Sequence, residues 1–128
     1  MFRFVFLATG LFCIALGALV IMAPRTYLTL YAVSYSPEMD FAAQRLGAGL
    51  IGLGGFMGLI RLLPPSPLAL RFALMVALVW VVTALTGVLH FVTGVATANI
   101  LIAAALEVGL AALFVFVGLR HRNAATPS

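Results

Sequence analysis

FAAQRLGAGLIGLGGFMGLIRLL, residues 41–63, is an apolar stretch interrupted by only three strongly polar side chains. A helix needs about 20 predominantly apolar residues to cross the hydrocarbon core of a bilayer, and this stretch is long enough. Ser36 and Pro37 precede it, and these residue types are favoured as the cap and the first residue of a helix. Pro64 and Pro65 follow it, and proline cannot continue a helix. The pattern predicts a membrane-spanning helix over residues 41–63.

Three further apolar runs surround this segment, at residues 4–23, 68–92 and 99–119. Each reaches the length of a span, and none shows the period-two alternation of a membrane β-barrel. The first run is longer than the roughly 7–15 apolar residues of a signal peptide, so we expect a retained helix. The chain is therefore predicted to be all-α: one membrane domain over residues 1–128 that forms an integral membrane four-helix bundle.

The composition excludes most soluble functions. Of the 128 residues, 65% are hydrophobic and 8% charged, whereas a soluble domain is about half apolar and about a quarter charged. The net charge is +4, but the arginines are scattered at segment ends and lack the clustering of a nucleic-acid site. Cys13 is the only cysteine, so no intramolecular disulfide can form. Metal-ligand spacings, nucleophile elbows and phosphate loops are absent from the sequence, so we expect no enzymatic activity.

The placement of arginine predicts the orientation. With four spans, the N-terminus, the turn between the second and third spans and the tail at residues 120–128 share one side. That side holds five arginines: Arg3, Arg61, Arg71, Arg120 and Arg122. The other side, with the loop at residues 24–40, holds Arg25 and at most Arg45. The positive-inside rule therefore predicts a multi-pass protein of a bacterial inner membrane with both termini in the cytoplasm.

All three tyrosines lie in the outer loop, at Tyr27, Tyr31 and Tyr35. Their spacing of four places them on one side of a short helix, and tyrosine favours the headgroup level of a membrane. We predict a short interfacial helix that anchors the bundle. The alternative is a lid, or a platform on which a partner docks.

Small residues indicate how the helices pack, because close approach replaces the hydrophobic effect between helices in lipid. The span over residues 41–63 has small residues on two opposite faces, so we expect it to be the central helix. One face holds Ala43, Gly47, Gly54 and Gly58, and the other holds Arg45, Gly49, Gly52 and Phe56. Gly54 and Gly58 form a GxxxG pair, a common motif that is only a weak indication of dimerisation.

Trp80 is the only tryptophan and falls near the middle of the third span rather than at an interface. It shares a face with Ala73 and Ala77, so we expect its indole to fill space inside the bundle. The alternative is contact with a bound lipid, quinone or pigment.

Arg45, His90 and Glu107 are the ionisable side chains inside the spans that need an explanation. Such residues are costly in a membrane and face the interior or a cavity. All three are expected at similar depth in the outer half, so we predict a polar cluster with an Arg45–Glu107 ion pair and Gln44 nearby. The pair could fix helix register, or the cluster could bind the polar head of a quinone, lipid or small solute. His90 as a haem or pigment ligand is a further alternative, although no second histidine lies within a span.

Gly17 with Ala23-Pro24, Arg45 with Gly49 and Gly52, and Glu107 recur in a known layout. On these residues the chain resembles the small bacterial four-helix membrane proteins of unknown function near the DoxX-like group. The resemblance covers most of the chain and implies a compact bundle. DoxX-like relatives include subunits associated with quinone-linked oxidoreductases, so the resemblance also implies an accessory role.

These observations predict a non-enzymatic accessory or assembly subunit that packs against a larger respiratory or photosynthetic membrane complex. The alternative is a quinone-, lipid- or solute-binding or transport module built on the polar cluster. The expected partners are membrane lipids and either other membrane subunits or a second copy, with no nucleic acid. A bound lipid, quinone or pigment is the kind of cofactor that would fit.

Overall fold

The computed structural model describes residues 1–124 and contains five α-helices in this part of the chain. They are α1 (Phe2–Met22), α2 (Pro24–Tyr31), α3 (Met39–Ile60), α4 (Pro67–Val92) and α5 (Asn99–Asn123). Four of them, α1, α3, α4 and α5, are long and apolar enough to cross a membrane. The predicted all-α four-helix membrane fold with a short helix in the first loop is therefore confirmed.

The helix ends follow from local sequence. Ser66 caps α4, because its hydroxyl accepts a hydrogen bond from the Ala69 N–H at 3.2 Å and Pro67 occupies the first helical position. Ser36 does not cap α3 in the same way. Its carbonyl accepts the Met39 N–H at 3.0 Å within a turn, so α3 begins only at Met39. The second span therefore runs over residues 39–60. It begins two residues and ends three residues earlier in the chain than predicted.

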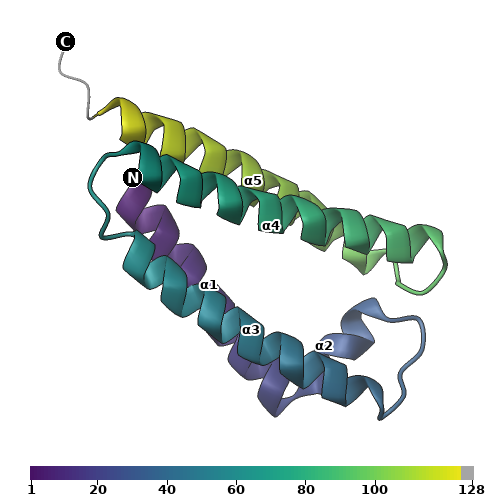
Figure 1. Cartoon of the computed structure of the whole chain (residues 1–128). Coiled ribbons are helices and arrows are strands. Elements are labelled where there is room, and N and C mark those ends of the chain that lie inside the picture. Colours follow the sequence, from purple (N-terminus) through teal and green to yellow (C-terminus); the bar gives the residue numbers. More distant parts are fainter. Residues whose placement is uncertain (125–128) are drawn as a thin grey trace.

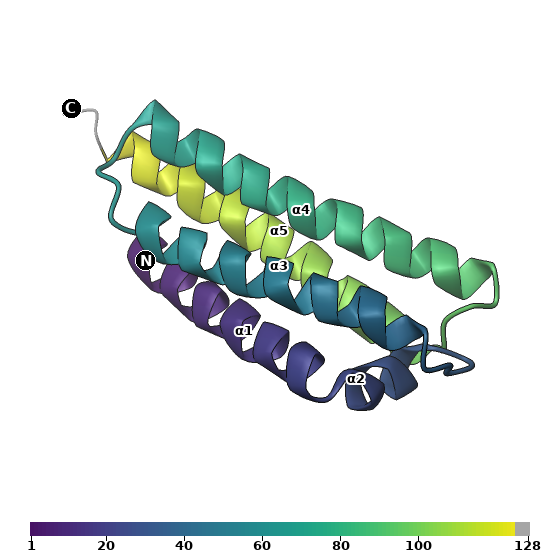
Figure 2. The ribbon, with the colours of Figure 1, turned by 60° about the horizontal axis from the view of Figure 1, so that its bottom comes forward.

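The four long helices form two antiparallel arms rather than one even bundle. The first arm consists of α1 and α3, and the second arm consists of α4 and α5. Nearly all contacts between long helices lie within one of these two arms. The two arms meet where the chain termini lie and separate toward the other end (Figure 1), and a second view shows α1 beside α3 and α4 beside α5 (Figure 2). The space between the arms is therefore widest at the end that holds α2.

The ends of the molecule differ in charge. The starts of α1 and α4 and the ends of α3 and α5 lie together, and we call this the arginine end. It carries the five arginines that were predicted to share one side: Arg3, Arg61, Arg71, Arg120 and Arg122. The opposite end, which we call the tyrosine end, carries α2 and the loops at residues 32–38 and 93–98.

Aromatic side chains join the two arms near the arginine end. Phe6 of α1 meets Phe114 of α5 edge-on, with ring centroids 4.9 Å apart, and both side chains are fully buried. Phe56 of α3 meets Phe72 of α4 at 5.6 Å. Buried aliphatic side chains of all four long helices complete this core. The hydrophobic core thus lies in the half of the molecule nearer the arginine end. The two arms separate beyond it, toward the tyrosine end (Figure 1).

The prediction that the span over residues 41–63 is central is wrong. Gly47 and Gly54 of α3 pack against α1, but a Cβ added to Gly49, Gly52 or Gly58 would meet no atom within 4 Å. Of the face that holds Arg45, Gly49, Gly52 and Phe56, Phe56 meets Phe72 of α4, whereas Gly49 and Gly52 are uncovered. The GxxxG pair is divided as well, because only Gly54 lies in a helix contact.

Candidate functional site

Helix α2 closes the open end between the arms because the loop between α4 and α5 holds it there. The Leu30 carbonyl at the end of α2 accepts two hydrogen bonds at 3.1 Å, from the Thr97 hydroxyl and the Asn99 amide. The Tyr31 carbonyl accepts the Thr97 N–H at 2.6 Å, and Ala32 pairs with Ala96 as a single antiparallel bridge. The free carbonyls at the end of a helix need such partners. The loop therefore fixes α2 against the second arm.

Two of the three tyrosines lie together on α2. The rings of Tyr27 and Tyr31 meet edge-on at 5.2 Å between centroids, as the spacing of four predicts. Tyr35 does not share their face, because α2 ends at Tyr31 and Ala32 is extended. The Tyr35 hydroxyl instead donates to the Asp40 carboxylate, at 3.1 and 3.0 Å from its two oxygens. The Arg25 guanidinium lies 5.4 Å from the centre of the Tyr35 ring.

Glu107 of α5 lies within electrostatic range of Tyr27. Burial raises the pKa of the Tyr27 phenol above its usual value near 10, and negative charge at Tyr31 and at Glu107 raises it further. Glu107 is half-buried and stands one helical turn before Ala111, a residue of the core. Tyr27 and Tyr31 of α2 and Glu107 of α5 are far apart in sequence, and we call these three residues the tyrosine–glutamate site.

The predicted ion pair between Arg45 and Glu107 is not formed. Over residues 1–124, Arg45 has no carboxylate within ion-pair distance, and its guanidinium lies 5.6 Å from the centre of the Phe41 ring. Arg45 stands six residues after the start of α3, so its long side chain can turn back one helical turn toward the tyrosine end. This arrangement keeps the charge near the headgroups, as expected of an arginine close to a helix end.

His90 and Gln44 also lie apart from Glu107. Gly87 of α4 packs against Ile100 of α5, so His90, one turn further on, is at the level of the loop and is exposed. Glu107 is seven residues past Ile100, or roughly 10 Å deeper. The expectation of similar depth is therefore wrong. The Gln44 amide donates to the Ile21 carbonyl at 3.4 Å. It thereby satisfies a free carbonyl in the last turn of α1.

Trp80 is buried in the core with Ala77 and Ala111, and 6% of its surface is exposed. Its place among alanines inside the molecule agrees with the prediction. The indole Nε1–H has no hydrogen-bond partner among the described residues. A buried polar group without a partner is uncommon and costs about 1–3 kcal/mol.

Two carboxylates lie at the start of α3, Glu38 just before the helix and Asp40 in its first turn. The Ser36 side chain hydrogen bonds to Glu38 and lowers the pKa of that carboxyl group. Partial burial and the hydrogen bond to Asp40 raise the pKa of Tyr35, while the Arg25 cation opposes this change. Neither carboxylate belongs to a metal site: in residues 1–124 no group of three or more His, Cys, Asp and Glu side chains could hold a metal ion.

Sequence reasoning missed the link between α2 and α5. The Asn99 side chain reaches across to the Leu30 carbonyl, which lies 69 residues away in the sequence. Sequence reasoning also placed Glu107 with arginine rather than with tyrosine. Comparison of the chain with protein-family models, with curated proteins and with solved structures finds no match.

Proposed function

We propose that this protein is a non-enzymatic accessory or assembly subunit that packs through α3 against a larger membrane complex, respiratory or photosynthetic. The observation that carries the proposal is the uncovered small-residue face of α3. A Cβ on Gly49, Gly52 or Gly55 would meet nothing within 4 Å. We call these three glycines the open face of α3.

The contrast within one helix supports this assignment. Gly47 and Gly54 face α1 and allow the two backbones to touch, which is how small residues act between membrane helices. The open face offers the same kind of surface on the other side of α3, where residues 1–124 supply no helix. A face of glycines gains little from contact with lipid tails, but it allows close approach of another helix.

A photo-crosslinking residue at position 52 tests the proposal in native membranes. We expect adducts with another membrane protein from position 52. The matched control is position 109 on α5, because Gly109 also has no atom within 4 Å of an added Cβ. Adducts that form equally from both positions would contradict a specific interface. Adducts of the mass of two copies would replace the accessory role by a homo-oligomer.

The tyrosine–glutamate site favours a second candidate function, a quinone-, lipid- or solute-binding or transport module. Glu107 is a carboxylate in a span without an ion-pair partner in residues 1–124, and an ionisable residue within a membrane marks a functional site by default. Tyr27 provides a phenol within electrostatic range of this carboxylate. Native mass spectrometry separates the two candidates: a bound small molecule lost in Glu107→Gln supports binding, and heterologous subunits support the accessory role.

The bacterial inner membrane and the cytoplasmic location of the arginine end belong to the same proposal. Five arginines at one end against two toward the other support it through the positive-inside rule. A cysteine introduced at Ser34 should react with a membrane-impermeant thiol reagent applied to intact cells. Reaction of a cysteine at Ser66 instead would reverse the orientation.

A further inference from the structure

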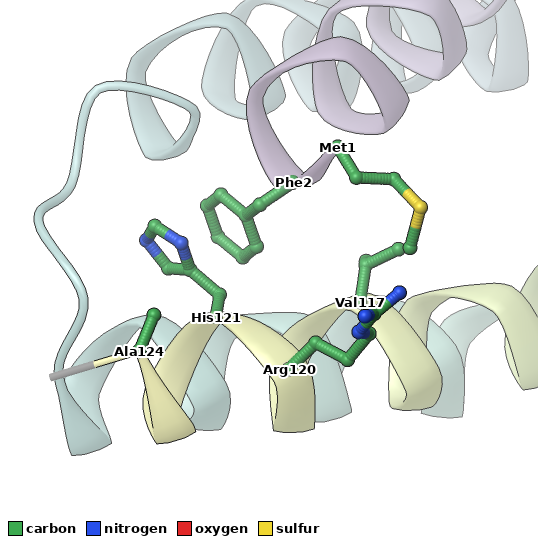
Figure 3. Close-up of a pocket in the computed structure, with 6 residues that line it drawn as sticks. All are labelled: Met1, Phe2, Val117, Arg120, His121 and Ala124. Atoms are coloured by element: carbon green, nitrogen blue, oxygen red, sulfur yellow. The ribbon is translucent and has the colours of Figure 1, made fainter. Parts of the chain in front are cut away.

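A pocket of about 190 Å³ opens at the arginine end, between the start of α1 and the last turns of α5. It is lined by Met1, Phe2, Val117, Arg120, His121 and Ala124, and Figure 3 shows the Phe2 ring beside the His121 imidazole in its wall. The volume is below the 300–1,000 Å³ of pockets that hold drug-sized ligands. The pocket therefore suits a compact group rather than a complete small molecule.

The walls of the pocket are held in place by contacts with the core. Phe2 is 4% exposed and stacks on His121 with ring centroids 4.0 Å apart and planes 8° from parallel. The His121 Nε2–H donates to the Leu63 carbonyl at 3.2 Å, since a carbonyl can only accept. This bond ties the last turns of α5 to the end of the first arm, so the pocket exists before any ligand binds.

The pocket is lined by the basic side chain of Arg120 and by no Asp or Glu side chain. Arg120 and His121 line it, and the Arg120 guanidinium lies 5.5 Å from the centre of the Phe116 ring. The three acidic residues of the protein, Glu38, Asp40 and Glu107, all lie away from the arginine end. Five arginines gather at that end without an Asp or Glu side chain among them.

We propose that the pocket binds the phosphate group of an anionic phospholipid from the adjoining leaflet. Arg120 donates to the phosphate oxygens as a planar fork. Val117 and Phe2 form the apolar floor, and the exposed Phe116 continues that surface toward the lipid tails. Basic pockets between membrane helices at the cytoplasmic headgroup level are sites for such lipids. This site is separate from the open face of α3 and from the tyrosine–glutamate site.

Lipid titration of the full chain in a neutral detergent, followed by native mass spectrometry, tests the proposal. The probes are phosphatidylglycerol and, as a zwitterionic reference, phosphatidylcholine. The variants are Arg120→Gln and Arg122→Gln, which each remove one positive charge from the end of α5. Only Arg120 lines the pocket, whereas Arg122 hydrogen bonds to Asn123. A lost charge-assisted hydrogen bond predicts about tenfold weaker phosphatidylglycerol binding for Arg120→Gln.

We expect Arg122→Gln to bind phosphatidylglycerol within about twofold of the original protein, and Arg120→Lys to recover part of the loss because it keeps the charge. Phosphatidylcholine, whose phosphate charge is offset by its choline group, should bind the original protein more weakly than phosphatidylglycerol. Equal losses for Arg120→Gln and Arg122→Gln would overturn the proposal in favour of diffuse surface attraction. Displacement of phosphatidylglycerol by inorganic phosphate would assign the pocket to a soluble anion. If Arg120→Gln does not fold, equal binding of the two lipids to the original protein would still refute the site.

Discussion

Gly10 of α1 and Gly54 of α3 meet backbone to backbone, so that a Cβ on Gly10 would lie 2.8 Å from the Gly54 carbonyl oxygen. Two turns away, a Cβ on Gly17 would lie 2.5 Å from the Gly47 carbonyl oxygen. Distances under 3.0 Å are essentially never seen for real Cβ atoms. The first arm is therefore built on two points where only hydrogen fits, and these points fix the register of α1 against α3.

A methyl group in this contact should separate the helices of the first arm. We expect Gly54→Ala to lower the free energy of unfolding by about 1–3 kcal/mol, since backbone must move to make room. Gly52→Ala, in the same helix and with open space around it, should be neutral or slightly stabilising, because alanine favours helix. Unfolding by denaturing detergent measures both. Equal stability of the two variants would show that the contact is not tight.

Substitution of Trp80 tests whether a bound molecule supplies a hydrogen-bond acceptor to its indole. Its Nε1–H is buried without a partner in residues 1–124, so Trp80→Phe removes no hydrogen bond. We expect the free energy of unfolding to change by less than about 1.5 kcal/mol, whereas Trp80→Ala should cost about 3–5 kcal/mol through the cavity it leaves. A loss above about 2 kcal/mol in Trp80→Phe would reveal an acceptor such as a bound lipid or quinone.

The titration of Tyr27 should report the charge of Glu107. With Tyr31→Phe and Tyr35→Phe as background, Tyr27 is the only phenol, and its pKa lies above the usual value near 10. Glu107→Gln removes a negative charge and should lower this pKa, as measured by phenolate absorbance. Glu38→Gln, whose charge acts on Tyr35 instead, should leave it unchanged. If the Tyr27 pKa does not change in Glu107→Gln, the charge of Glu107 does not act on Tyr27.

The sign of the pH dependence follows from the raised pKa. A folded-state pKa above the unfolded value favours the neutral phenol, so the contribution of Tyr27 to stability is complete below about pH 10. It is lost as the pH rises through the folded pKa. Thermal unfolding measures the stability difference between the original protein and Tyr27→Phe. We expect this difference to change with pH only in strongly alkaline buffer.

Asn99 and Thr97 should hold α2 across the open end. Asn99→Leu removes a hydrogen bond to Leu30, and we expect a cost of about 1 kcal/mol that appears as faster amide exchange in α2 and not in α1. Thr93→Val is the matched control, because the Thr93 hydroxyl bonds only within its own helix end, to Leu89 and His90. Equal exchange in both variants would show that α2 is held by other contacts.

The sequence predicted features that depend on local pattern. Apolar runs, prolines and the spacing of tyrosines gave the helices within a few residues, and the face of Ala73, Ala77 and Trp80 is buried as predicted. The count of four spans correctly grouped the helix ends. Each of these features is set by residues near one another in the chain.

The partners of the polar residues could not be predicted in the same way. Arg45, Glu107 and His90 lie on three helices, and pairing them required a depth and a direction for each. The side chain of Arg45 turns back over Phe41, and the start of α3 at Met39 leaves it close enough to the membrane surface to do so. Residue type indicated that an acid and a base could pair, but not that each had another neighbour.

The sequence by itself determined that this chain forms four membrane-spanning helices and a short helix in the first loop, because helix formation in lipid depends on runs of apolar residues and their breaks. Only the tertiary structure decided that these helices divide into two arms. The reason is that both faces of α3 are rich in glycine and look alike in sequence, while only Gly47 and Gly54 find matching glycines on α1. The open face of α3 and the tyrosine–glutamate site both follow from that division.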